Sequence, residues 1–159
     1  MKQKIFLFEV ILFAQIFFSC KGQSTAPESL ADLHLTFISG SIGADLMPSI
    51  PPDPITCQII IVAENSSATR TLSNLSAAHA DVFLNSSNEK LGTITFTSNW
   101  DGRLGPTERD TVRLTKVISQ TTLFNPQCRK YVYLNLVFKN NSGNFIVQKT
   151  DSLFFGCVY

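Results

Sequence analysis

Residues 55 to 64 restrict the fold of this chain more than any other segment. Their odd-numbered positions hold Ile55, Cys57, Ile59, Ile61 and Ala63, which are all apolar. Successive side chains of a β-strand point to opposite faces, so this period of two predicts a strand with one face in the core. The chain must therefore build a sheet with at least one buried face.

Further strand-like segments follow at regular spacing, each bounded by turn-forming residues. Four prolines between positions 48 and 54 forbid a central strand or a helix there, so we expect residues 40 to 54 to form an irregular connection. No helical period of ten residues competes. The sequence predicts an all-β, seven-stranded antiparallel sandwich, with strands beginning at Leu33, Ile55, His79, Leu91, Arg109, Arg129 and Asn144.

The layout of residues 32 to 159 resembles the immunoglobulin-like or fibronectin-type sandwich, in which two antiparallel sheets pack face to face. The resemblance is one of strand pattern. The only tryptophan, Trp100, falls in an expected loop rather than in the third strand. We therefore expect a single immunoglobulin-like domain over residues 32 to 159 and assign no family.

Cysteines provide a test of the strand pairing. An oxidising compartment favours one disulfide among Cys57, Cys128 and Cys157. If Ser142 and Gly143 form a two-residue turn between the last two strands, Cys128 faces Cys157 across the hairpin. The same turn places Val132 opposite Leu153 and Phe138 opposite Val147. The alternative pair is Cys57 with Cys128, because both would begin strands at the same end of a sandwich and face its core.

The first 19 residues are typical of an export signal rather than of a folded domain. Lys2 and Lys4 precede an apolar run that stops at Ser19 and Cys20, the order found in secretory signals that are later removed. The run is interrupted by polar residues and is shorter than the roughly 20 residues that span a bilayer. We expect residues 1 to 19 to be a signal peptide, with a retained anchor helix as the alternative.

The end of this run resembles the signal of bacterial lipoproteins, in which a small residue precedes a cysteine that becomes the lipidated first residue. Ser19 and Cys20 match that pattern, and residues 20 to 31 have the composition of a flexible tether. The resemblance implies a lipid on Cys20, stable anchoring by its acyl chains and a place in the cell envelope, at the outer membrane. The alternative is ordinary cleavage nearby, for instance after Gly22.

Charge and motifs exclude several classes of function. The chain carries 13 basic and 12 acidic side chains and has no basic stripe, so nucleic acid is not expected as a partner. It lacks a phosphate-binding loop, a serine nucleophile elbow and a zinc-binding His-Glu-x-x-His motif. His34 and His79 have no ligand partner at metal-binding spacing. We therefore expect no enzyme, no cofactor and no metal site.

One loop holds the candidate binding residues Trp100, Asp101 and Arg103, because an aromatic ring and an arginine are the residue types that dominate binding interfaces. The sequence favours a lipid-anchored envelope protein acting as a non-catalytic binding or structural module for a protein or a glycan. The alternative is an accessory subunit of a secretion, pilus or polysaccharide-handling assembly. An exposed apolar patch or a free sheet edge would favour this second function.

Overall fold

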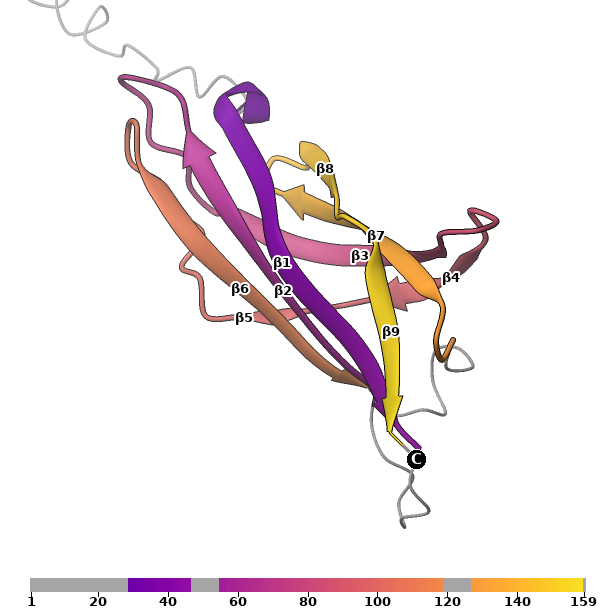
Figure 1. Cartoon of the computed structure of the whole chain (residues 1–159). Coiled ribbons are helices and arrows are strands. Elements are labelled where there is room, and N and C mark those ends of the chain that lie inside the picture. The colour runs from indigo at the N-terminus through magenta and orange to yellow at the C-terminus, as the bar shows by residue number, and fades with distance from the viewer. Residues whose placement is uncertain (1–28, 47–54, 119–126, 159) are drawn as a thin grey trace, which may run out of the picture.

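The computed structural model describes residues 29–46, 55–118 and 127–158 (Figure 1). The prediction of an all-β chain is confirmed. The expected export signal and Cys20 lie outside the described residues, as do residues 47–54 of the expected irregular connection. The described elements are η1 (Leu30–Asp32), β1 (Leu33–Asp45), β2 (Ile55–Asn65), β3 (Ser76–Leu84), β4 (Lys90–Ile94), β5 (Thr97–Ser98), β6 (Arg109–Ile118), β7 (Tyr131–Lys139), β8 (Phe145–Lys149) and β9 (Leu153–Val158).

The strands form one curled sheet in the order β4-β3-β7-β9-β1-β2-β6-β5, and β8 pairs with β7 beside β9. Strand β9 joins the two halves. It pairs antiparallel with β7, where Tyr131 lies opposite Phe154, and parallel with β1, where Ile42 lies opposite Phe155. The finer prediction of seven purely antiparallel strands is not confirmed, because the described residues form nine strands and one parallel pair.

The core lies between the two halves of the curled sheet. All five odd positions of β2 that the alternation assigned to the core, from Ile55 to Ala63, are at most 2% exposed. From the other half, Ala80 and Val82 of β3 and the even positions of β7, among them Phe138, are fully buried. The period of two in the sequence therefore placed these side chains on the correct face.

Strand β1 is longer than expected. The glycines at 40 and 43 predicted a loop, but the strand continues through them to Asp45, with an irregularity between Phe37 and Ser39. A Cβ at Gly40 would lie 2.6 Å from Ile59 Cδ1, and a Cβ at Gly43 would lie 2.9 Å from the Gly156 carbonyl oxygen. These glycines are therefore explained by close packing rather than by a turn.

The turn between β7 and β8 also differs from expectation. Gly143 N–H donates to the Asn140 carbonyl at 3.1 Å, and Gly143 has φ +81°. Lys139 pairs with Phe145, and Asn140 N–H donates to the Asn144 carbonyl at 3.1 Å. Three residues, 141–143, rather than two therefore separate the last hydrogen-bonded pair around the turn. Phe138 consequently faces Ile146 and not Val147.

A second irregularity restores the expected register further along. The buried side chain of Thr150 accepts a hydrogen bond from Leu134 N–H at 2.9 Å and donates to the Asp151 carbonyl at 2.8 Å. The strand breaks here, which divides the expected last strand into β8 and β9. Val132 then faces Leu153 as predicted, so two one-residue errors in the predicted register cancel.

Candidate binding surfaces

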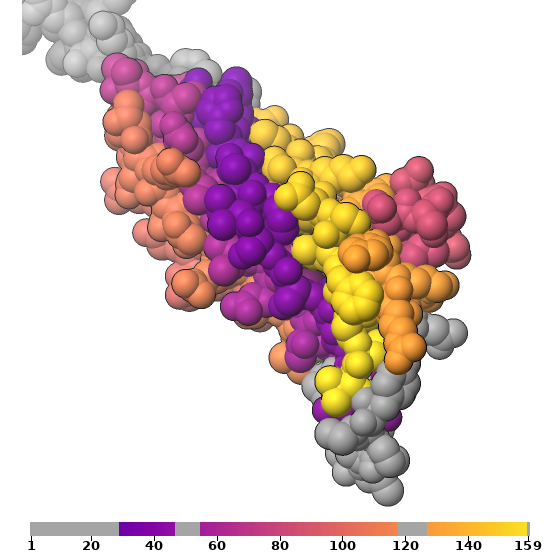
Figure 2. All heavy atoms as spheres, in the orientation of Figure 1, coloured from indigo at the N-terminus to yellow at the C-terminus, as the bar shows by residue number. Residues whose placement is uncertain are grey.

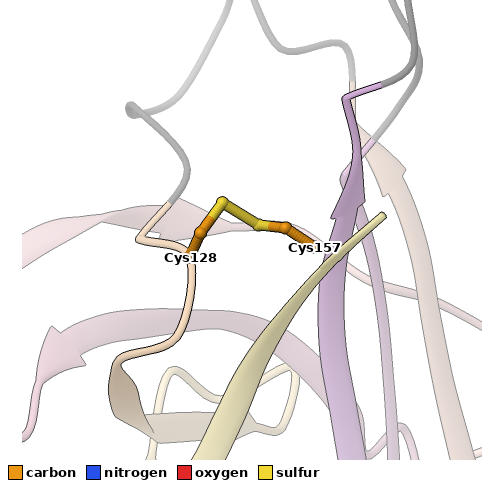
Figure 3. The surroundings of a disulfide bond; sticks show 2 residues. All are labelled: Cys128 and Cys157. Atoms are coloured by element: carbon orange, nitrogen blue, oxygen red, sulfur yellow. A yellow bond between two sulfur atoms is a disulfide. The ribbon is translucent and has the colours of Figure 1, made fainter. Parts of the chain in front are cut away.

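The predicted disulfide between Cys128 and Cys157 is present, with 5.5 Å between the two Cα atoms (Figure 3). The alternative pair of Cys57 with Cys128 is wrong, because Cys57 is a free, buried thiol on β2. Burial raises the pKa of the Cys57 thiol to about 12. This cysteine is therefore protonated and unreactive in the folded protein at neutral pH.

The backbone beside the disulfide is held in a tight bulge. Arg129 N–H donates to the Phe155 carbonyl at 3.0 Å, and Phe155 N–H donates to the Lys130 carbonyl at 2.8 Å. Two residues thus face one, and Arg129 has φ +61°, a conformation that glycine usually supplies at this kind of bulge. The disulfide and these two hydrogen bonds together fix the start of β7 against β9.

Two exposed aromatic side chains lie next to this bulge, one on each strand, and form what we call the distal aromatic pair. Tyr131 of β7 is 56% exposed and Phe154 of β9 is 51% exposed. Their ring centroids are 5.4 Å apart at an interplanar angle of 63°, an edge-to-face contact. Each ring is three residues from a disulfide-bonded cysteine, so the backbone that carries it has little freedom.

The same outer face of the sheet continues as a second aromatic contact. Phe83 stacks on Tyr133 with centroids 5.2 Å apart, and Lys149 Nζ lies 3.9 Å above the Tyr133 ring. Tyr133 Oη donates to Asn88 Oδ1 at 3.1 Å. These rings are largely covered by one another and by the lysine stem, so they support the face rather than present a free platform.

The acidic group on this face is neutralised locally. Lys90 Nζ lies 2.8 Å from Asp81 Oδ1, and Thr93 Oγ1 donates to the same oxygen at 2.6 Å. Desolvation raises the pKa of the Asp81 carboxyl, but the hydrogen bonds from Lys90 and Thr93 outweigh it and hold that pKa below its usual value. The carboxylate is therefore ionised and paired at neutral pH.

Basic residues predominate along β7, β8 and β9. Residues 127–158 contain Arg129, Lys130, Lys139 and Lys149 and a single acid, Asp151. The outer face of β1, β2 and β6 is different, because many of its exposed positions are hydroxyl or amide side chains: Thr36, Ser41, Thr56, Gln58, Thr111 and Thr115. Exposed Ile38, Val117 and Arg113 lie among them on these strands. One outer face is thus aromatic and basic, and the other is mainly polar with isolated aliphatic side chains.

The three candidate residues predicted from sequence do come together at one hollow. Trp100, Asp101 and Arg103 line a space of about 360 Å³, together with Glu108 and Asp110. Trp100 is only partly exposed, packs edge-on against Phe138 with centroids 6.4 Å apart, and its Nε1 has no hydrogen-bond partner among the described residues. The indole therefore covers the core, and ligand binding at this hollow stays a prediction.

The remaining chemistry-bearing side chains are dispersed. His34 is exposed and its Nε2 lies 3.2 Å from Ser66 Oγ. Within residues 29–46, 55–118 and 127–158, no three histidine, cysteine or acidic side chains gather as a metal site would require. In the same ranges no helix is long and apolar enough to span a bilayer.

Sequence reasoning did not single out Tyr131 and Phe154. In the segment Tyr131-Val132-Tyr133-Leu134 every side chain is apolar or aromatic, so alternation cannot show which ones face outward. The cysteines gave a usable signal, because pairing Cys128 with Cys157 places Tyr131 opposite Phe154.

Comparisons with known proteins leave the family open. No family model matches the chain, and no curated protein matches it. Among solved structures, the chain is similar to one described as the X-ray structure of Northeast Structural Genomics Consortium target SoR45, with 11% identity and a TM-score of 0.35, over 76% of this chain and 80% of that one. At that score the likeness supports no statement about fold or function.

Proposed function

We propose that this protein is a lipid-anchored, non-catalytic module of the cell envelope that binds another protein through the distal aromatic pair. The observation that carries the proposal is the position of Tyr131 and Phe154, two half-exposed rings braced by a disulfide. They lie toward the end of the domain where β1 finishes, whereas the chain enters at the end where β1 begins (Figure 1). A lipid on Cys20 would leave this pair facing away from the membrane.

The cysteines support a location in the cell envelope. Disulfides persist in exported proteins and are rare in the bacterial cytosol, and Cys128 is bonded to Cys157. Ser19 and Cys20 match the lipoprotein signal at the start of the chain. Export with lipidation of Cys20, followed by residence at the outer membrane, is consistent with both features.

Strand order supports an immunoglobulin-like sandwich as the finer description of the fold. One half runs β1-β2-β6-β5, and the other runs β4-β3-β7 followed by β8 and β9. With β1 as strand A, these are the orders A-B-E-D and C′-C-F-G of immunoglobulin-like domains. The bridge differs, since Cys128 and Cys157 join the strands equivalent to F and G and leave the cysteine of strand B free.

The chemistry of the distal aromatic pair favours a protein as the partner. Tyrosine and phenylalanine supply large contact area at little entropic cost, and rings held rigid before binding lose less freedom on association. Arg129 and Lys130 flank the pair and are exposed, which suits a partner surface with an apolar centre and acidic rim. An exposed apolar patch is the feature expected of an accessory subunit in an envelope assembly.

The anchor is tested by expressing the full precursor in a diderm bacterium, partitioning it in Triton X-114 and weighing the mature protein. We expect detergent-phase protein with the mass of an acylated chain that begins at Cys20. Aqueous-phase protein that begins near Gln23 would exclude the anchor.

Partner binding is tested separately by placing a photo-cross-linking phenylalanine analogue at position 154 in cells. The matched control carries the same group at Thr36, an exposed position on the polar face. We expect one discrete adduct from position 154, lost when Tyr131 is replaced by serine, and none from position 36. Equal adducts from both positions, or none from position 154, would contradict binding through this pair.

A further inference from the structure

We propose that the turn between β7 and β8 contacts the phospholipid surface that carries the anchor, with Phe145 at the acyl boundary and Lys139 at the headgroups. This inference rests on the proposed lipidation of Cys20. The β7–β8 turn, at the opposite end of the aromatic, basic face from the distal aromatic pair, would then bind lipid. This contact would define the orientation of the domain on the membrane.

Phe145 is the first observation. At 68% it is the most exposed large hydrophobic side chain in the described part of the protein. It begins β8 one residue after the three-residue turn at 141–143. A phenylalanine at the tip of a hairpin covers no core, so its exposure is not explained by packing within the domain.

The second observation is where the chain enters. Residues 29–31 and 143–146 line one hollow of about 600 Å³, so the start of the described chain lies beside this turn. Figure 2 shows β1, which follows directly, running from this end beside β9 toward the other end. Nine Cα-to-Cα steps separate Cys20 from Ser29, and they span at most about 30 Å when fully extended.

The length of the connection from Cys20 distinguishes the two ends of the aromatic, basic face. The lipid end of the chain and the β7–β8 turn are joined by that short connection. The distal aromatic pair lies about 26 Å further along β7, since eight residues separate Lys139 from Tyr131 at about 3.3 Å each. The turn lies beside Ser29 and can meet the bilayer while the connection stays short, whereas the pair could reach it only with the connection almost fully extended. We therefore assign the lipid contact to the turn and leave the pair to a protein partner.

The side chains at the turn suit an interface between water and lipid. Lys139 and Phe145 are directly paired across the strands, both exposed, and share the outer face. A lysine stem extends along apolar surface and places its charge at phosphate groups, while an aromatic ring enters the headgroup and acyl boundary. At the same end Asp32 is paired with Arg70, which removes one source of repulsion from anionic lipid.

The test uses the lipidated protein in vesicles of equal parts phosphatidylethanolamine and phosphatidylglycerol, with and without brominated acyl chains. Three proteins are compared: the parent, which contains Trp100, Phe145→Trp, and the matched control Phe154→Trp from the other end of the face. Both substituted positions are exposed, so neither variant is expected to unfold. We expect brominated lipid to remove most of the added fluorescence of Phe145→Trp and to leave that of Phe154→Trp unchanged.

Equal quenching of the two variants, or none at position 145, would overturn the proposal. The same Phe145→Trp change is also made in a chain produced without its signal peptide and with Cys20→Ser, which carries no lipid and needs no detergent. A blue-shifted emission there would also overturn the proposal, since the ring would then be buried in a second copy of the chain.

Failure of the anchor is distinguished by a second arm of the experiment. If the bacterium does not acylate Cys20, the chain from Cys20 onward is coupled to a maleimide phospholipid, which reacts at Cys20 because Cys57 is buried and the other cysteines are bonded. Quenching at position 145 in this arm supports the lipid contact even though natural lipidation is excluded. Its absence overturns the contact whatever the outcome for Cys20.

Discussion

At the scale of single residues, Thr107 is held in a conformation that its side chain disfavours. Glu108 N–H donates to the Gly105 carbonyl at 3.2 Å, which closes a turn with Pro106 second and Thr107 third. Thr107 has φ +57°, the left-handed region that a type II turn requires at this position and that suits glycine or asparagine. For a β-branched residue this φ is an outlier.

The surroundings explain why the turn persists. Thr107 N–H donates to the Ser67 carbonyl at 2.9 Å. Fully buried Asn65 donates through Nδ2 to the Gly105 carbonyl at 2.8 Å and to the Arg70 carbonyl at 2.6 Å. These bonds join two loops at the end of the domain where the chain enters, so they fix Thr107 in place despite its strain.

Replacing Thr107 with glycine should therefore raise the free energy of unfolding by about 1 kcal/mol, because the backbone strain disappears and the Ser67 hydrogen bond remains. The measurement is the urea midpoint at unchanged slope. Asn74→Gly is the matched control: Asn74 is exposed with φ +54°, and asparagine already tolerates this region, so its gain should be smaller. A loss of stability in Thr107→Gly would show that the threonine side chain stabilises the turn.

At the scale of elements, the alternation of apolar and polar residues predicted the strands that have one buried and one exposed face. It failed where close backbone packing or a backbone hydrogen bond determines how far a strand extends. Strand β2 was predictable because its odd side chains are all apolar. The second half of β1 was not, because Gly40 and Gly43 indicate a turn in sequence and serve close packing in the structure. The break at Thr150 was also hidden, since a single threonine gives no sign that its hydroxyl will bond to Leu134 N–H.

The residues of the candidate binding surfaces also differ in how well the sequence predicted them. Cys128 and Cys157 were paired correctly from sequence, but the predicted turn was one residue too short and the break at Thr150 offset that error. The outward positions of Tyr131 and Phe154 could not be read from a uniformly apolar segment. The partial burial of Trp100 depends on its contact with Phe138, a residue that is distant in sequence and lies beside it only in the folded protein.

The contact between β1 and β9 gives a test at this scale. Gly43 and Gly156 are opposite each other in the parallel pair, but only a Cβ at Gly43 would collide, at 2.9 Å from the Gly156 carbonyl oxygen. We expect Gly43→Ala to lower the free energy of unfolding by about 1–3 kcal/mol, as overpacking does. Gly156→Ala should be nearly neutral, because no atom lies within 4 Å of its added Cβ. Similar losses in both, measured by urea unfolding, would contradict the close approach.

At the scale of the whole molecule, strand pairing among the described residues joins the two halves of the sheet through β9. The joint with β7 is short, since the ladder contains the pairs Tyr131 with Phe154 and Val132 with Leu153. The joint with β1 covers residues 42 to 45 of β1. The disulfide lies at this joint and adds a covalent link between the segment before β7 and the end of β9.

Removing that link should weaken the whole fold. Cys128 and Cys157 are 29 residues apart, and a loop of this size implies a loss of about 3–4 kcal/mol in the free energy of unfolding when the bridge is absent. We expect this loss in the double variant Cys128→Ser with Cys157→Ser, measured by urea unfolding.

The reductant provides the internal control for the same experiment. The parent should fall to the stability of the double variant when dithiothreitol is added, whereas the double variant should not change, because its remaining described cysteine, Cys57, is a free thiol. Amide hydrogen exchange locates the effect: protection should fall first where β1 pairs with β9 and persist where β2 pairs with β6, a ladder of ten residue pairs. Uniform loss of protection would mean that the two halves unfold as one unit and that β9 is not the weak joint.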